Sequence, residues 1–127
     1  MDYAITNLRD VEDSAAKFGY GDRQESRFPS TDLGTESTGL AYHVVKPGQR
    51  QPFGHRHDQA EEVHVVISGS GTLKLGDETH PVRALDAIRV APGVARGFEA
   101  GPEGLEYVVF GPHHENDGDL LKDFWDD

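Results

Sequence analysis

The most informative segment of the chain, residues 48–69, reads GQRQPFGHRHDQAEEVHVVISG. In an extended chain alternate side chains share a face, so His55 and His57 project together while Arg56 points away. The residues that follow His57 can form a turn, and Glu62 then opens a run rich in β-branched residues. Two imidazoles and a carboxylate on adjacent strands match the arrangement that leaves coordination positions open on iron or a similar divalent ion.

Short β-branched or aromatic runs alternate with Gly and Pro turn signals through the middle of the chain, which predicts an all-β domain. The Gly-rich segment 68–71 and the Gly-Pro pair 101–102 are expected to end strands. Pro81 limits its run to an edge strand or a bulge because it cannot donate to the ladder. Seven runs near the usual strand length favour a sandwich or a barrel, and they cover residues 38–46, 62–68, 72–75, 79–83, 86–91, 96–100 and 105–110.

The two ends of the chain differ from this β pattern, within what we expect to be a single domain. Residues 1–37 are expected to hold a short helix, which Gly19 ends, and then an irregular arm. Residues 112–127 form an acidic tail in which an apolar stripe predicts a short helix that packs on the chain's own barrel or on a second subunit, the barrel being the simpler alternative. The helical spacing rests on Leu8, Val11, Ala15 and Phe18 at the first end, and on Leu120, Leu121, Phe124 and Trp125 at the second.

Composition excludes several classes of protein. The chain has 127 residues, with 12 Lys plus Arg against 23 Asp plus Glu, and the formal net charge of −11 opposes binding to nucleic acid or to an anionic membrane. The absence of Cys removes disulfides, thiol catalysis and Cys-based metal sites. The first residues lack the features of a signal peptide, and no apolar run approaches the ~18 residues of a membrane span, so we expect a soluble, cytoplasmic protein.

Residues 48–69 resemble the first motif of the cupin superfamily. That motif reads Gly, about five residues, His-x-His, three or four residues, Glu, six residues, Gly. Here it appears as Gly48, six residues, His55-x-His57, four residues, Glu62, six residues, Gly69. The resemblance extends over 38–111 and implies a double-stranded β-helix, a jelly-roll-like barrel, in which the two histidines and the glutamate hold a metal.

The second cupin motif is degenerate in this chain. Leu85, Ala91 and Ala100 replace its Gly, Pro and Asn, and Arg96 stands where the family places its fourth metal ligand. A guanidinium stays protonated and offers no lone pair, so Arg96 cannot coordinate a metal. The resemblance therefore passes ligand roles to three residues and not to a fourth.

Arg96 leaves two states of the site open. Without a metal, Glu62 and Arg96 are mutually neutral and can form a bidentate pair. With a divalent ion (Fe, Mn, Ni or Zn), the ion, Glu62 and Arg96 together carry two net positive charges, so an anionic ligand must join them. The metal-bound state therefore implies a small anionic molecule, for which Arg96 is a candidate ligand-binding residue.

Other residues are candidates for the same pocket. His64 shares the face of Glu62 and either supplies a nitrogen to the site or is a neutral interior histidine. Phe53 has the parity of His55 and His57 and lines the cavity or belongs to the core. Further candidate wall residues, which a register slip by one residue would invert, are Tyr42, Phe98 and Tyr107.

Two functions fit these observations. The first is a metal-dependent cupin, an oxygenase or isomerase if it is catalytic, that acts on a small anionic metabolite. The alternative is a metal-free cupin that binds or senses such a metabolite, with Arg96 paired to Glu62. Because an open barrel has sheet edges to protect, we expect a homodimer.

Overall fold

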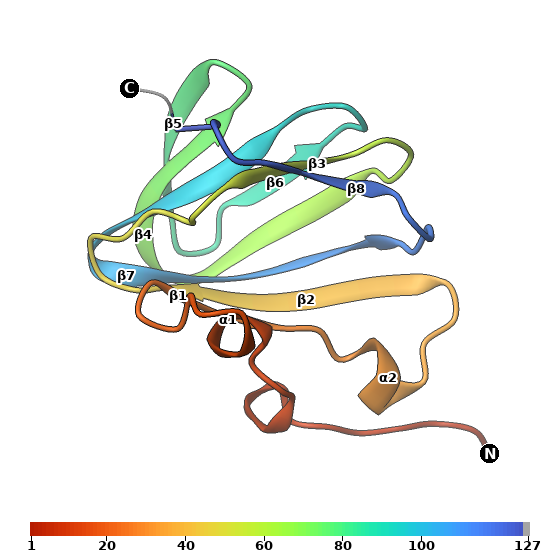
Figure 1. Ribbon diagram of the computed structural model, residues 1–127. Helices are drawn as coiled ribbons and strands as arrows, with labels where there is room; N and C mark the ends of the chain where they lie inside the picture. The colour runs from red at the N-terminus through yellow and green to blue at the C-terminus, as the bar shows by residue number, and fades with distance from the viewer. Residues whose placement is uncertain (126–127) are drawn as a thin grey trace.

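In the computed structural model, eight strands form one continuous antiparallel sheet that curls over on itself (Figure 1). The structure describes residues 1–125. The strands are β1 Gln24–Arg27, β2 Thr38–Val45, β3 Gly54–His57, β4 Glu62–Leu75, β5 Glu78–Arg83, β6 Ala87–Val90, β7 Arg96–Pro112 and β8 Gly118–Leu121. Three short helical segments precede or join them: a 3₁₀ turn at Leu8–Asp10, α1 at Ser14–Lys17 and α2 at Ser30–Leu33.

The long strands β4 and β7 pass through both halves of the sheet. In one half, the order is β1-β2-β7-β4-β6, where Val63 to Val66 of β4 lie opposite Phe110 to Tyr107 of β7. In the other half the order is β5-β4-β7-β3-β8, where Gly71 to Leu75 lie opposite Ala100 to Arg96. The two halves face each other and enclose the core.

Glycines occupy the corner where β4 and β7 cross between the halves. Gly69 has a φ of +80°, and a Cβ atom on it would lie 2.0 Å from the carbonyl oxygen of Gly104. The register shifts on both sides of this point, as in a β-bulge. The expected strand ends at 68–71 and 101–102 are therefore wrong: the glycines bend two continuous strands instead of ending them, because a bend and a turn require the same backbone freedom.

The predicted all-β architecture is confirmed, with strands over most of the expected runs. Among the described residues β5 pairs only with β4, so Pro81 lies on an edge strand as predicted. The core fills the space between the halves with inward-facing side chains of the central strands. Its buried members are Ala41, Val45, Val66, Leu73, Val82, Phe98, Ala100, Leu105, Tyr107 and Val109.

The N-terminal segment is more ordered than the sequence suggested. The expected helix is divided into the 3₁₀ turn and α1, and Gly19 follows α1 with a φ of +88°. The expected irregular arm contains β1, which pairs with β2, and α2. α1 and α2 lie next to β1 and β2 (Figure 1).

The expected C-terminal helix is wrong, because residues 118–121 form β8, which pairs with β3. The tail nevertheless packs on the chain's own sheet, which is the simpler of the two alternatives that the sequence left open. Phe124 lies so close to Gly54 that a Cβ atom there would be 2.4 Å from its Cγ, and Trp125 donates its Nε1 hydrogen to the carbonyl oxygen of Gln51 at 2.9 Å. The apolar residues of the stripe thus belong to a strand and to the turn that follows it. Pairing of this strand with β3 decides its conformation, and the helical spacing of the apolar residues does not.

None of the helices in the described part of the chain has the length and apolar character needed to cross a membrane.

Candidate functional site

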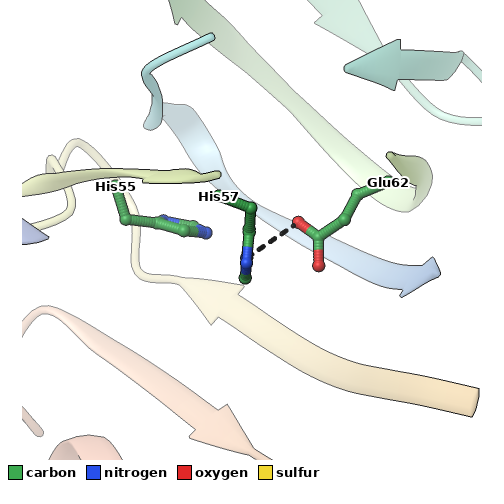
Figure 2. Close-up of side chains that lie close together, drawn as sticks. All are labelled: His55, His57 and Glu62. Carbon is green, nitrogen blue, oxygen red and sulfur yellow. Dashed lines mark ion pairs between the residues drawn. The ribbon is translucent and has the colours of Figure 1, made fainter. Parts of the chain in front are cut away.

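Three potential metal ligands converge between the two halves of the sheet. His55 and His57 extend from the same face of β3, and Glu62 reaches them from the start of β4 (Figure 2). One ligand atom from each of the three lies within 4.8 Å of the others. Nε2 of His57 is 3.4 Å from Oε1 of Glu62. The structure therefore brings together the three side chains that the sequence predicted as a cluster.

Asp117 fixes the turn that separates His57 from Glu62. Its carboxylate accepts hydrogen bonds from the backbone N–H groups of Gln59, at 2.7 Å, and Ala60, at 3.0 Å. Its own carbonyl accepts one from Asp58. This carboxylate substitutes for the strand partners that a turn lacks, so it sets the distance between the end of β3 and the start of β4.

The same carboxylate faces the far side of the His57 ring. Oδ2 of Asp117 lies 3.3 Å from Nδ1 of His57, which leaves Nε2 directed toward Glu62. Metal-binding histidines typically have a carboxylate or carbonyl at the ring nitrogen that does not bind the metal. Burial raises the pKa of Asp117, but the backbone N–H groups of Gln59 and Ala60 outweigh it, and the net pKa lies below its usual value. Asp117 is therefore ionised at neutral pH.

Sequence reasoning missed Asp117 by placing it in an acidic, solvated tail. It is only 4% exposed. Its hydrogen bonds span 57 and 58 residues of sequence. No local pattern indicates such a contact.

Arg96 contacts the same carboxylate oxygen of Glu62 that lies near His57. It is paired in register with His55, its side chain is fully buried, and its guanidinium donates to Oε1 of Glu62 and to the carbonyl of Val94. It is not among the residues that line the cavity described below. The pairing with Glu62 that the sequence allowed is present, and Nε of Arg96 has no hydrogen-bond partner among the described residues. Direct contact between Arg96 and a ligand stays a prediction.

Burial keeps His55 and His64 neutral. It lowers the pKa of His55 to about 3, with a further lowering by the charge of Arg96. It also places the pKa of His64 well below the ordinary value, again with Arg96 contributing. A neutral imidazole at position 55 has a lone pair available to a metal at physiological pH.

His64 is an interior histidine and not a member of the cluster. It is 1% exposed and packs against Phe98 and Tyr107, at ring-centroid distances of 5.7 and 5.8 Å. Its Nδ1 has no hydrogen-bond partner among the described residues. The geometry thus favours the interior alternative of the two that the sequence left open.

The residues present fit a divalent metal. Two imidazoles and a carboxylate form a donor set typical of iron, manganese, nickel or zinc. A divalent ion and Arg96 together contribute three positive charges, and Glu62 and Asp117 two negative ones. One positive charge therefore remains, one fewer than the sequence alone indicated, because Asp117 was not foreseen.

A cavity of about 590 Å³ opens beside the two histidines. Phe53 lines it, which is the cavity alternative of the two that the sequence left open, whereas Glu62 does not line it. The three most exposed apolar side chains on its wall, Phe18, Phe28 and Leu120, form what we call the mouth. The remaining lining residues are Ser14, Ala15, Tyr20, Gln24, Ser26, His43 and Gln51, together with His55 and His57 themselves.

The aromatic wall residues expected at 42, 98 and 107 do not line this cavity. Tyr42 lies one position from His43, which does line it, so Tyr42 faces the other way and donates its hydroxyl hydrogen to Glu106. Phe98 and Tyr107 belong to the core. Tyr107 lies behind the wall, where its ring stacks on His43 at a centroid distance of 5.0 Å.

The cavity wall also contains a hydrogen-bonded pair, Ser26 and His43, that the sequence did not predict. Oγ of Ser26 lies 2.9 Å from Nδ1 of His43, and both residues are buried. The two residues are directly opposite in the pairing of β1 with β2. Burial lowers the pKa of His43 to about 4, against the opposing charge of Asp13, so the ring is neutral. Because β1 was not expected, sequence reasoning found no partner for His43.

Comparison with known proteins identifies the family. The family described as Cupin domain matches residues 41–111. A search of the curated proteins found no match to the chain.

Solved structures share the fold at low sequence identity. A cupin protein from Bacteroides fragilis is 18% identical, with a TM-score of 0.72 over 91% of this chain and 88% of its own. The polyketide cyclase RemF from Streptomyces resistomycificus is 24% identical, with a TM-score of 0.74 over 94% and 84%. Oxalate decarboxylase from Bacillus subtilis is 21% identical, with a TM-score of 0.73 over 94% of this chain and 33% of its own.

The curled antiparallel sheet is thus the double-stranded β-helix that the resemblance implied. Because the matched region covers more than half of the chain and includes β3, β4 and both histidines, this chain belongs to the cupin family.

Proposed function

We propose that this cupin holds a divalent transition metal with His55, His57 and Glu62 and presents it to a small molecule in the adjoining cavity. The observation that carries the proposal is the convergence of the three donors within 4.8 Å, with both histidines on the cavity wall. When bound, the ion would supply Lewis-acid chemistry or bind oxygen, which suits an isomerase or an oxygenase. The same fold occurs in a polyketide cyclase and an oxalate decarboxylase, so it accommodates enzymes.

The chain's own residues prepare the site for the ion. Asp117 directs Nε2 of His57 toward Glu62, and burial keeps His55 neutral. Arg96 holds one oxygen of Glu62 and thereby orients the carboxylate. Since one positive charge remains after the metal, Glu62, Arg96 and Asp117 are counted, the ligand is expected to contribute one anionic oxygen.

Metal analysis tests the proposal without an assay for activity. Protein purified without an affinity tag is stripped with chelator, reloaded with Fe²⁺, Mn²⁺, Ni²⁺ or Zn²⁺, and analysed for bound metal. We expect about one equivalent of one of these ions in the wild type and less than about a tenth in His57→Ala. His80→Ala, at an exposed histidine of β5, is the matched control and should load like the wild type.

Two outcomes would remove the metal proposal. One is wild-type protein that holds less than about a tenth of an equivalent before and after reloading. The other is equal loading of wild type and His57→Ala, which would place the metal elsewhere.

The contact between Arg96 and Glu62 favours a second candidate, a metal-free cupin that binds or senses its ligand. In that case Arg96 neutralises Glu62 permanently, and the cavity works without an ion. An Arg96→Ala protein that gains metal and keeps its stability would exclude this candidate.

We also propose that the chain forms a homodimer. The two halves of the sheet end in β1 and β6, and in β5 and β8, which leaves strand edges that a second copy can cover. Size-exclusion chromatography with light scattering measures this directly, and a monomer at micromolar concentration would contradict it.

A further inference from the structure

The cavity beside the histidines is lined by apolar and neutral polar side chains, which do not favour a charged metabolite. None of its described lining residues is a Lys or an Arg. The cations of a neighbouring hollow, Arg23 and Lys122, are exposed and share that hollow with Asp22. A phosphate or carboxylate placed in the cavity would therefore find no cationic side chain on its wall, apart from the ion of the proposed function.

Aromatic rings dominate the apolar part of the wall. Phe18 and Phe28 at the mouth are 71% and 52% exposed. Tyr20 and Phe53 meet edge to face at a centroid distance of 5.6 Å, and Phe28 meets His43 in the same way. Exposed apolar side chains gathered around a cavity mark a binding site, and aromatic faces and edges pair best with another ring.

Two polar atoms of the lining residues have no hydrogen-bond partner among the described residues: Nδ1 of His57, which lies 3.3 Å from the carboxylate of Asp117, and Oε1 of Gln24. Gln24 is 7% exposed and lines the cavity, and its Oε1 accepts no hydrogen bond from any described residue. A buried acceptor without a donor is unfavourable, so a ligand that supplies an O–H or N–H group at this point gains a hydrogen bond. Ser26 lies two residues further along β1 on the same wall, next to the neutral ring of His43.

We propose that the cavity binds a flat aromatic molecule that carries a hydroxyl group. The ring packs among the aromatic side chains of the wall, and the hydroxyl donates its hydrogen to Oε1 of Gln24. This inference rests on the proposed function only in taking the cavity as the ligand site, and it requires no metal.

Binding of 2-naphthol to metal-stripped protein, followed by calorimetry, tests the proposal. The comparison ligand is 2-methoxynaphthalene, which keeps the rings but has no hydrogen to donate. We expect 2-naphthol to bind about tenfold more tightly than the ether. Gln24→Leu should weaken 2-naphthol about fivefold to tenfold and change the ether less than about twofold.

Two further variants keep the result interpretable. Gln49→Leu replaces an exposed glutamine outside the cavity and should leave both affinities unchanged. Phe28→Ala, at an exposed position that does not threaten folding, should weaken both ligands because it removes ring contacts. Circular dichroism shows whether Gln24→Leu folds, and if it does not, the Phe28→Ala comparison decides.

Several results would overturn the proposal. These are no saturable binding of 2-naphthol, equal affinity for 2-naphthol and its ether, or tighter binding of inorganic phosphate. A dimer formed through the mouth would also overturn it. Such a dimer would dissociate in Phe28→Ala, and the wild-type dimer would not bind 2-naphthol. Failure here with normal metal loading would leave the proposed metal site intact, whereas 2-naphthol binding without metal loading would sink only the metal site.

Discussion

The two ends of the cavity are built from opposite chemistries. Charged side chains surround His55 and His57 at one end: Glu62 pairs with Arg96, and Asp117 faces the ring of His57. At the mouth, and along the β1 wall, the polar groups are neutral and the rest is apolar. Charge is thus confined to the end where a metal would be held, so the rest of the cavity is left to recognise shape and hydrogen-bonding groups.

Removal of Arg96 should break this contrast most strongly. Arg96→Ala leaves Glu62 without its buried cation, and loss of one partner of a buried pair costs about 3 kcal/mol or more of unfolding free energy. Urea unfolding of metal-free protein measures the loss. Arg89→Ala, which removes an exposed ion pair with Glu61, is the matched control and should change stability by less than about 1 kcal/mol.

Addition of a divalent ion to Arg96→Ala tests whether a metal can substitute for the lost guanidinium. If the three donors form a metal site, the ion can replace the missing positive charge and restore part of the stability of Arg96→Ala. An unchanged stability in the metal-free variant would show that Glu62 does not depend on Arg96.

Acidification should destabilise the protein by protonating the buried, neutral His43 of the cavity wall. Its pKa is about 4 in the folded protein against 6.5 when unfolded, so between these values the unfolded chain binds the extra proton. The contribution of His43 to the unfolding free energy is therefore fully present above pH 6.5. It is lost as the pH drops toward 4, and the loss is on the order of 3 kcal/mol. Thermal unfolding from pH 7 to pH 4.5 should show a smaller fall for His43→Gln than for the wild type.

His80→Gln provides the comparison for that pH series, since His80 is exposed on β5. It should follow the wild-type profile. A His43→Gln profile that coincides with the wild type would contradict the buried, neutral state of the ring.

Asp117→Asn should give the smallest of these effects, because it alters the surroundings of the proposed ligand His57 and removes none of the three ligands. The amide retains one acceptor oxygen for the turn but loses the negative charge at Nδ1 of His57. Metal affinity, measured by competition with a chelator, is expected to fall about 10-fold to 100-fold. Asp119→Asn, at an exposed position on β8, is the control, and an equal effect of the two variants would deny Asp117 its role.

Local patterns were sufficient for some parts of the molecule. The alternation of side chains along residues 54–57 and the start of β4 placed His55, His57 and Glu62 on converging faces, and the structure confirms it. The same parity made Phe53 a candidate for the cavity wall, where the structure has it. These predictions succeeded because a strand fixes side-chain direction within a few residues.

Other parts required contacts between distant segments. The helical spacing of Leu120, Leu121 and Phe124 was misleading because β3 offers the tail an edge to pair with. Tyr42 was placed on the wrong face because the register of β2 depends on its neighbours. Neither outcome is encoded in the residues adjacent to the position.

The sequence by itself determined the β architecture and the three donors of the candidate metal site, since strand period and turn spacing act over short distances. Only the tertiary structure decided that Asp117 directs His57, that Arg96 faces Glu62 and not the cavity, and that Gln24 carries an unpartnered acceptor. Each of these depends on which strands lie side by side. That choice is made by the burial of side chains far apart in the chain, and no local pattern reports it.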